Sequence, residues 1–454
     1  MKPEFQQNPK EAGETAAPAV KTKTDLVHDE FFDENSLITV KKDVAARQEK
    51  RMFSDIEEMT RTGRWEDILS LYYPVEEKIP ELLDHGMAQR VREKVAFALG
   101  QVKRFDEAIA CLQTCVEANP ENFYIRSSLA YTAYNSLYAA KNREIMLTGG
   151  LRAERIQLAH ENFEKACDIR PDEVTCFYRT GMLYKQIENK VEQAGPMFEK
   201  AVHNWEQLSP EDREKRHQQR KNYVKALYQM ASCRLEAGDH GRALALIQKC
   251  LSEDEKSGHL SLVFKYFALG KIHFNAGSFP EARDALLFAV KSGKAGRQPI
   301  DFVYELLARN YLAMEYPERA LEFIHMVPEK ARRPYVRWTE ADAHCALEQY
   351  NQARQVLQKS LERDNRSRHK SLIKLARLEY GLANFEQAGK RAEQADQFFR
   401  EKWGNPCLDG LFWGAAAALR SGNKDRAIEL ADALQAHATH YPNLKRLQAA
   451  IAEA

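Results

Sequence analysis

The sequence predicts an all-α fold that is built from repeated pairs of helices. Three observations support this prediction. Apolar residues recur with helical spacing from about residue 46 to about residue 445. No segment sustains the alternation of apolar and polar residues that marks a β-strand. A fixed order of aromatic, small and apolar residues also returns many times along the chain.

The recurring order is clearest in "FDEAIACLQTCVEANP", residues 105–120. It begins with the aromatic Phe105, continues through Ala108, Leu112 and the small Cys115, and ends at Pro120. A fixed order that returns is the signature of a repeat architecture. Other copies are Phe279, Ala282, Leu286 and Ala289; Tyr350, Ala353, Leu357 and Ser360; and Phe385, Ala388, Ala392 and Ala395.

A second small residue lies about twelve positions before each alanine of this order. Small residues let the axes of two helices approach closely, and the neighbouring aromatic side chains fill the space around the crossing. The pattern therefore predicts two helices per unit that touch at small residues. These earlier small residues are Ala96, Ala130, Gly181, Ala231, Gly270, Ala308, Ala341, Ala376 and Ala415.

This pattern resembles the tetratricopeptide repeat, a helix–turn–helix unit of about 34 residues. The resemblance implies a right-handed α-α superhelix, a tetratricopeptide solenoid of about ten helical hairpins. The array is expected over residues 46–445, between a disordered tail over 1–45 and a C-terminal tail over 446–454. Its units are expected to begin near residues 49, 89, 123, 174, 224, 263, 301, 334, 369 and 408.

Two insertions interrupt the predicted array, at residues 139–157 and 205–222. In the first, Gly149 and Gly150 predict a turn. In the second, Ser209 is a good helix cap, and we expect this segment to extend the following helix. The tail holds a candidate docking motif, "HDEFFDENSLITV" (28–40), which is acidic with a hydrophobic cluster. It suits docking either on a partner or in the chain's own groove.

Charge and hydropathy exclude several classes of protein. Lys and Arg (67) almost cancel Asp and Glu (66), so no bulk charge favours nucleic acid or an anionic membrane. No apolar run is long enough for a membrane span, and no signal peptide is visible at the N-terminus. Eight cysteines in 454 residues fit a reducing compartment. We therefore expect a cytoplasmic protein.

The chemistry-bearing residues predict packing and no catalytic, cofactor or metal site. Cys111 and Cys115 lie four apart, but they supply at most two ligands, and Cys115 stands where other repeats place alanine. His273 and His344 fall at core positions of their repeats. No phosphate-binding loop, nucleophile elbow or zinc-protease motif is present. We expect that the protein is not an enzyme.

The resemblance also implies a partner-binding groove, lined by positions 2, 5, 9 and 12 of the first helix of each unit. Aromatic residues dominate these positions and basic residues intersperse them, a composition typical of protein-binding hot spots. The implied groove residues are Tyr124, Tyr131, Tyr134, Tyr178, Met182, Lys185, Lys225, Tyr228, Phe264, Phe267, Lys271, Phe274, Phe302, Arg309, Tyr335, Trp338, Lys370, Arg377, Tyr380 and Phe412.

One known subtype of the family binds the C-terminal carboxylate of chaperones with a clamp of Lys and Asn residues. Lys370 and Lys374 match the last part of that clamp, whereas Glu305, Arg309 and Thr339 replace its earlier members. The sequence therefore does not support binding of chaperone tails.

The predicted function is a protein–protein interaction scaffold or adaptor that holds a peptide or partner segment in the groove. Aromatic side chains would bury apolar residues of the partner, while Lys and Arg would select acidic ones. One alternative is an accessory or regulatory subunit of a larger enzyme or of a secretion or motility assembly. Another is a nucleic-acid-associated helical-repeat protein, against which the near-zero net charge argues. Self-association remains open.

Overall fold

The computed structural model describes residues 50–80, 87–296 and 298–454, and within these ranges it contains helices and turns but no strand. The predicted all-α helical-repeat solenoid is confirmed. The expected tail over 1–45 and its candidate motif 28–40 lie outside the described residues. No helix in the described ranges is long and apolar enough to cross a membrane. The chain divides into two compact units between Val102 and Lys103.

The first unit departs from the small-residue pattern. Ile56 and Ile68 stand where other repeats place small residues, and both are fully buried. Helix α2 packs against α4, and the Trp65 and Phe97 rings lie edge to face. The described helices of this unit are residues 50–62, α2 (Trp65–Tyr72), α3 (Val75–Lys78) and α4 (Met87–Gln101).

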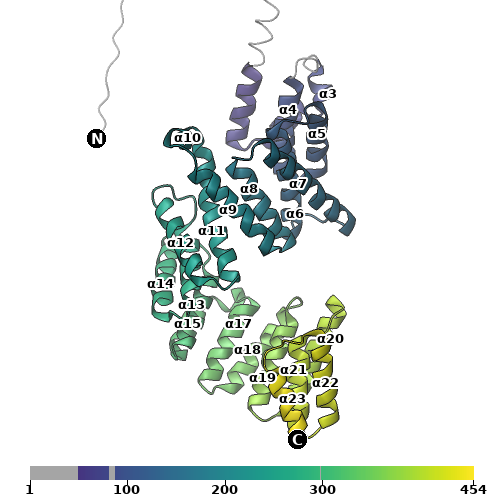
Figure 1. Cartoon of the computed structure of the whole chain (residues 1–454), viewed down its shortest axis with the longest axis vertical. Coiled ribbons are helices and arrows are strands. Elements are labelled where there is room, and N and C mark those ends of the chain that lie inside the picture. Colours follow the sequence, from purple (N-terminus) through teal and green to yellow (C-terminus); the bar gives the residue numbers. More distant parts are fainter. Residues whose placement is uncertain (1–49, 81–86, 297) are drawn as a thin grey trace, which may run out of the picture. The chain divides into compact units, whose positions relative to one another are not determined.

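The second unit is a series of helical hairpins in which each helix packs against the next, except that α9 packs directly against α11 past the short α10 (Figure 1). From α8 onward, the first helix of each hairpin also contacts the first helix of the following hairpin. The helices are α5 (Phe105–Ala118), α6 (Phe123–Lys141), α7 (Gly149–Ile169), α8 (Val174–Met182), α9 (Val191–Glu206), α10 (Pro210–Lys215), α11 (Arg220–Glu236), α12 (His240–Glu253), α13 (Leu262–Asn275), α14 (Phe279–Ala295), α15 (Asp301–Ala313), α16 (Pro317–His325), α17 (Pro334–Ala346), α18 (Tyr350–Arg363), α19 (Arg368–Gly381), α20 (Phe385–Trp403), α21 (Leu408–Arg420), α22 (Lys424–His437) and α23 (Leu444–Glu453).

Small residues lie at the helix crossings, as the sequence predicts. A Cβ atom at Gly181 would stand 2.6 Å from Cε1 of Phe198, so the two helices approach as closely as a glycine allows. Cys115 and Cys250 are 1% and 0% exposed, so both fill the space that alanine fills in other repeats. The close crossings leave the large side chains to pack around them.

The first insertion lengthens one hairpin and contains no glycine turn. Gly149 and Gly150 are the first two residues of α7, because the Thr148 hydroxyl accepts a hydrogen bond from the Leu151 N–H and caps the helix there. The predicted turn was therefore wrong. The added length gives α6 and α7 more turns than the helices of most other hairpins.

This longer hairpin supports a π-helix, Leu183–Glu188, that continues α8. Lys141 Nζ donates to the Gln186 carbonyl (2.6 Å), and the Arg152 guanidinium donates to the Ile187 carbonyl (2.9 Å). Carbonyl groups at the end of a helix lack partners within the helix, and these two cations supply them. Residues from the insertion thus stabilise the next hairpin.

Two other segments differ from expectation. Ser209 caps a helix, as predicted, but that helix is the separate α10, because the backbone at Arg216 departs from helical geometry. The predicted extension of the following helix was wrong. Residues 446–454 were expected to form a tail, but residues 446–453 lie within α23, whose Leu447 and Ile451 are buried. Both segments therefore carry helical structure of their own.

A buried ion pair holds the connection between α12 and α13. Lys265 Nζ lies 2.9 Å from Asp254 Oδ2, and the two side chains are 1% and 0% exposed. Asp254 also accepts the backbone N–H groups of His259 and Leu260. Burial alone would raise the pKa of Asp254, but these donors outweigh it and hold the pKa below its usual value.

The close crossing at Gly181 gives a test of the packing. Gly181→Ala is expected to lower the free energy of unfolding by about 1–3 kcal/mol, because its Cβ would overlap the buried Phe198 ring. Gly389→Ala is the matched control. Its Cβ would lie at an ordinary 3.7 Å from Cβ of Ala417, so helix propensity should leave stability unchanged or raise it by up to about 1 kcal/mol. Urea unfolding measures both, and equal effects would contradict the packing described.

Candidate functional site

The predicted groove residues lie on α6, the α8 segment with its π-helix, α11, α13, α15, α17, α19 and α21. We call this set of positions the first-helix face. Its side chains form three groups that join neighbouring first helices, and these are described below. Tyr124, Phe264, Lys271, Arg309, Lys370 and Arg377 are exposed, Tyr134 is buried, and the others are half-buried.

A tyrosine group joins α6 to α8. The rings of Tyr131 and Tyr134 stack with centroids 6.1 Å apart, and the Arg179 guanidinium lies 3.7 Å from the Tyr131 centroid. Tyr134 is only 7% exposed because Tyr131 and Tyr138 stack on either side of it. Burial raises the pKa of Tyr134 and of Tyr178. The expectation that Tyr134 points into an open groove was wrong.

The middle of the face, on the π-helix and α11, mainly contributes to packing. The Lys185 side chain is 10% exposed and its Nζ lies 3.6 Å from Glu236 Oε1. Met182 and Tyr228 pack against the core of these hairpins. Burial raises the pKa of Tyr228 to about 12 and lowers the pKa of Lys225. These residues offer less surface to a partner than the sequence alone suggests.

A phenylalanine group joins α13 to α15. The Phe302 ring stacks on Phe264 at 5.8 Å and meets the edge of Phe267 at 4.7 Å. Phe264 is 46% exposed. The Arg309 guanidinium lies 5.1 Å from the Phe274 centroid. The group therefore presents aromatic rings and a cation together.

A tryptophan group joins α17, α19 and α21. Trp338 donates its indole N–H to Ser371 Oγ at 2.7 Å, and Lys370 Nζ lies 5.6 Å from the Trp338 ring. Arg377 lies 5.7 Å from the ring of Trp413. Within the described chain, neither Lys370 nor Arg377 has a carboxylate at ion-pairing distance. Within the described residues, the charges of these two side chains are therefore not compensated by an ion pair.

Sequence reasoning missed Trp413. It follows the predicted Phe412 and falls just outside the groove positions, yet its ring meets Tyr380 edge to face at 5.4 Å. A tryptophan among the small residues of "LDGLFWGAAAAL", a stretch of which half is glycine or alanine, was the available signal.

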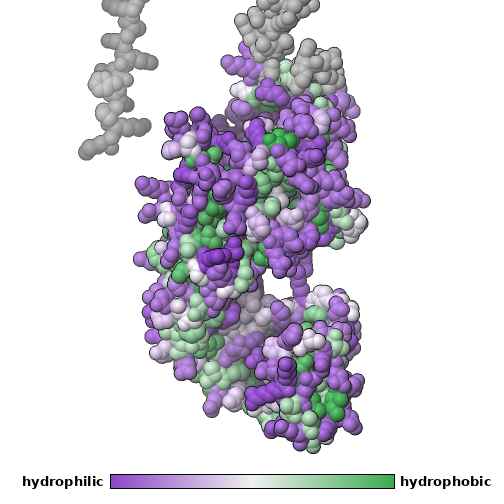
Figure 2. All heavy atoms as spheres, in the orientation of Figure 1, coloured by the Kyte–Doolittle hydropathy of each residue, from purple (hydrophilic) through white to green (hydrophobic). Residues whose placement is uncertain are grey.

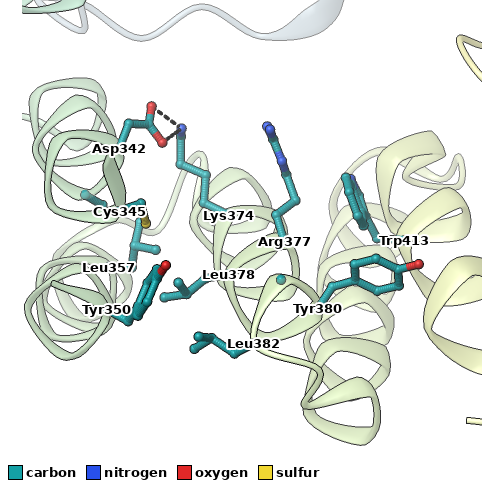
Figure 3. A pocket seen from close by; sticks show the side chains of 12 residues that line it. Asp342, Cys345, Tyr350, Leu357, Lys374, Arg377, Leu378, Tyr380, Leu382 and Trp413 are labelled. Carbon is teal, nitrogen blue, oxygen red and sulfur yellow. Dashed lines mark hydrogen bonds and ion pairs between the residues drawn. The ribbon is translucent and has the colours of Figure 1, made fainter. Parts of the chain in front are cut away.

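A pocket of about 400 Å³ opens beside the tryptophan group. Figure 3 shows Arg377 between Lys374 and Trp413, with Tyr380 beside the indole and leucines from α18 and α19 on the other side. Lys374 Nζ donates to both oxygens of Asp342 at 2.7 Å, so its charge is already compensated. The pocket thus combines an apolar wall with one uncompensated cation. Its lining residues include Asp342, Cys345, Tyr350, Leu357, Lys374, Arg377, Leu378, Tyr380, Leu382 and Trp413.

The residues at the chaperone-clamp positions are engaged with one another. Thr339 Oγ1 donates to Glu305 Oε1 at 2.8 Å, and burial raises the pKa of Glu305. Lys374 is held by Asp342. In the described ranges, no group of three or more His, Cys, Asp or Glu side chains gathers as a metal site would require.

On the side drawn in Figure 2, the surface is mostly hydrophilic, and hydrophobic side chains form scattered patches.

Sequence models of the tetratricopeptide repeat match the chain over residues 91–122 and 225–257, and the second match covers the α11/α12 hairpin. Over these two stretches the chain therefore carries tetratricopeptide repeats. No curated protein sequence matches the chain.

Solved structures with similarity to it include other repeat proteins. A tetratricopeptide repeat protein from Parabacteroides merdae is 15% identical, covers 64% of this chain and 98% of its own, and has a TM-score of 0.46. The structure of Naa15/Naa10 bound to HypK-THB is 14% identical, with 92% and 72% coverage and a TM-score of 0.44. PilW, a type IV pilus biogenesis factor, is 15% identical, with 53% and 91% coverage and a TM-score of 0.39.

The indole of Trp338 gives a test of the tryptophan group. Trp338→Phe keeps an aromatic ring but removes the hydrogen bond to Ser371, and it is expected to cost about 1 kcal/mol of unfolding free energy. Trp413→Phe is the matched control, because the structure gives its indole N–H no hydrogen-bond partner in the described residues. Urea unfolding compares the two. An equal or larger loss for Trp413→Phe would contradict this arrangement.

Proposed function

We propose that this tetratricopeptide-repeat protein is a non-catalytic scaffold that binds a segment of a protein partner along its first-helix face. Repeats of this family generally serve as protein-interaction scaffolds. The observation that carries the proposal is the placement of Lys370 and Arg377. Both are exposed, both lie over tryptophan rings, and neither has a carboxylate partner in the described chain.

The chemistry of the face favours an acidic partner segment that carries aromatic or aliphatic side chains. An apolar side chain fits the leucine wall of the 400 Å³ pocket, and a carboxylate beside it would reach Arg377. Burying an apolar side chain of ordinary size stabilises a complex by about 1.5–3 kcal/mol. An ion pair at an exposed rim adds less than about 1 kcal/mol but fixes orientation and raises the association rate. The apolar anchor therefore supplies affinity, and the cations supply selectivity.

The phenylalanine group on α13 and α15 would extend the same binding surface. It places the exposed ring of Phe264 against Phe302 and the Arg309 guanidinium over Phe274, and Arg309 Nε also lies 3.9 Å from Glu305 Oε1. An extended segment that contacts both groups gains from two attachments at once. We also propose a cytoplasmic location, which rests on eight cysteines and the reducing conditions that they suit.

Charge reversal tests the proposal with a defined set of probes. The probes are fluorescent acidic peptides with aromatic residues, among them the chain's own residues 28–40, and a single-stranded RNA of the same charge. Lys370→Glu with Arg377→Glu is expected to weaken peptide binding at least about tenfold, because two attractive contacts become repulsive. Lys390→Glu is the matched control, since Lys390 is equally exposed but lies on the second helix α20.

Fluorescence anisotropy at two salt concentrations measures the affinities. Peptide binding that survives the double reversal would move the site away from α17–α21. Binding of the RNA in preference to every peptide would favour the nucleic-acid alternative instead.

A further inference from the structure

Two cysteine side chains lie against each other where α7 meets α8. Cys167 stands in the last turn of α7, Cys176 in the first turn of α8, and their Sγ atoms are 3.0 Å apart. A disulfide bond has an S–S distance of about 2.05 Å, so the two atoms need to approach by about 1 Å more. The two positions belong to consecutive hairpins, so the sequence spacing gave no indication of this contact.

The two thiols have different surroundings. Cys176 is fully buried, and its S–H lies 3.5 Å from the Phe163 carbonyl, to which it donates. The hydrogen bond from Cys167, and then burial, raise the pKa of the Cys176 thiol. Cys167 is half-exposed and lines a pocket of about 590 Å³. An oxidant therefore reaches Cys167 first, and Cys176 stands behind it as the second thiol.

The charges around the pocket restrict the class of oxidant. Glu164 and Asp168 line the pocket beside Cys167, and both are exposed acids. An anionic disulfide such as oxidised glutathione is repelled by these carboxylates, whereas a small neutral peroxide is not. The pocket thus favours a neutral oxidant.

We propose that Cys167 and Cys176 form a reversible intramolecular disulfide when the protein meets a peroxide. The Cys167 thiolate attacks one oxygen of hydrogen peroxide, the O–O bond breaks, and hydroxide leaves, which gives a sulfenic acid. The Cys176 thiol then loses its proton and attacks the Cys167 sulfur. The S–S bond forms, the S–O bond breaks, and the leaving hydroxide takes up the proton as water. Two thiols and one hydrogen peroxide thus give one disulfide and two waters, and a dithiol reductant reverses the change.

The cross-link would join two consecutive hairpins through α8, the helix that also contacts the tyrosine group. Helix α8 carries Cys176 and also Arg179, which lies over Tyr131 of α6. A bond from Cys176 to α7 restrains α8 against the preceding hairpin. The closed loop is short, and such a bond stabilises mainly by restricting the unfolded chain. This inference does not depend on the proposed partner binding.

Mass mapping of the wild-type protein tests the disulfide directly. The reduced protein is treated with hydrogen peroxide, alkylated, digested and analysed by mass spectrometry. We expect a linked peptide pair that contains Cys167 and Cys176 and lacks two hydrogens, while the half-exposed Cys345 remains alkylated. In Cys176→Ser, the linked pair is lost and dimedone traps a sulfenic acid on Cys167. In the matched control Cys345→Ser, the link still forms.

The wild-type result stands without any variant, so misfolding of Cys176→Ser cannot obscure it. Unfolding in urea supplies a second measurement: the oxidised wild type should unfold at a higher concentration than the reduced protein, and this difference should vanish in Cys176→Ser. Wild-type protein in which Cys345 is oxidised while Cys167 and Cys176 stay alkylated would overturn the proposal. So would oxidation of Cys167 to a sulfinic acid without any link to Cys176.

Discussion

The close approach of helices at small residues is the constraint on which the second unit depends. At Gly181 and Gly270, a single Cβ atom would stand 2.6 Å from a buried side chain of the facing helix. Ala, Gly or Cys at these crossings fixes the distance between the helices of a hairpin and their rotation about their axes. Because the rotation is fixed, the other positions of each first helix are directed toward one face, from one hairpin to the next. The face is thus a consequence of the packing.

Aromatic side chains on this face pack neighbouring hairpins together and also form part of the exposed surface. Phe302 packs between Phe264 and Phe267, and Trp338 is tied to Ser371, so these rings hold neighbouring hairpins in register. If a partner binds at this face as proposed, rings already held by such contacts lose less entropy on binding. The same aromatic side chains thus contribute both to the packing between hairpins and to the exposed surface.

The sequence predicted those features that depend on local pattern. Helix pairs and their crossings follow from residues only a few positions apart. Ala282, Ala353 and Ala388 were therefore correctly assigned to the helix crossings, and all three are fully buried. Cys115 was assigned to packing for the same reason. The position of most aromatic residues on the first helices followed from the same spacing. Their exposure did not, because it depends on which neighbours cover each ring.

Features that depend on contacts between hairpins were missed. The π-helix at Leu183–Glu188 is supported by Lys141 and Arg152, which are remote in sequence. The burial of Tyr134 arises from stacking on both sides, and the contact between Cys167 and Cys176 arises from the meeting of two helices. Helix α7 starts at Gly149 because Thr148 caps it there. The preference of threonine for the N-cap position outweighed the tendency of two glycines to form a turn.

Photo-cross-linking tests the central claim, that partners bind along the first-helix face, most directly. An acidic, aromatic peptide with a photoreactive phenylalanine is bound to the full chain, irradiated, and its attachment points are mapped by mass spectrometry. The account predicts attachment on α17, α19 and α21, near Lys370, Arg377 and Trp413. Attachment mainly on the second helices α18, α20 and α22 would contradict it.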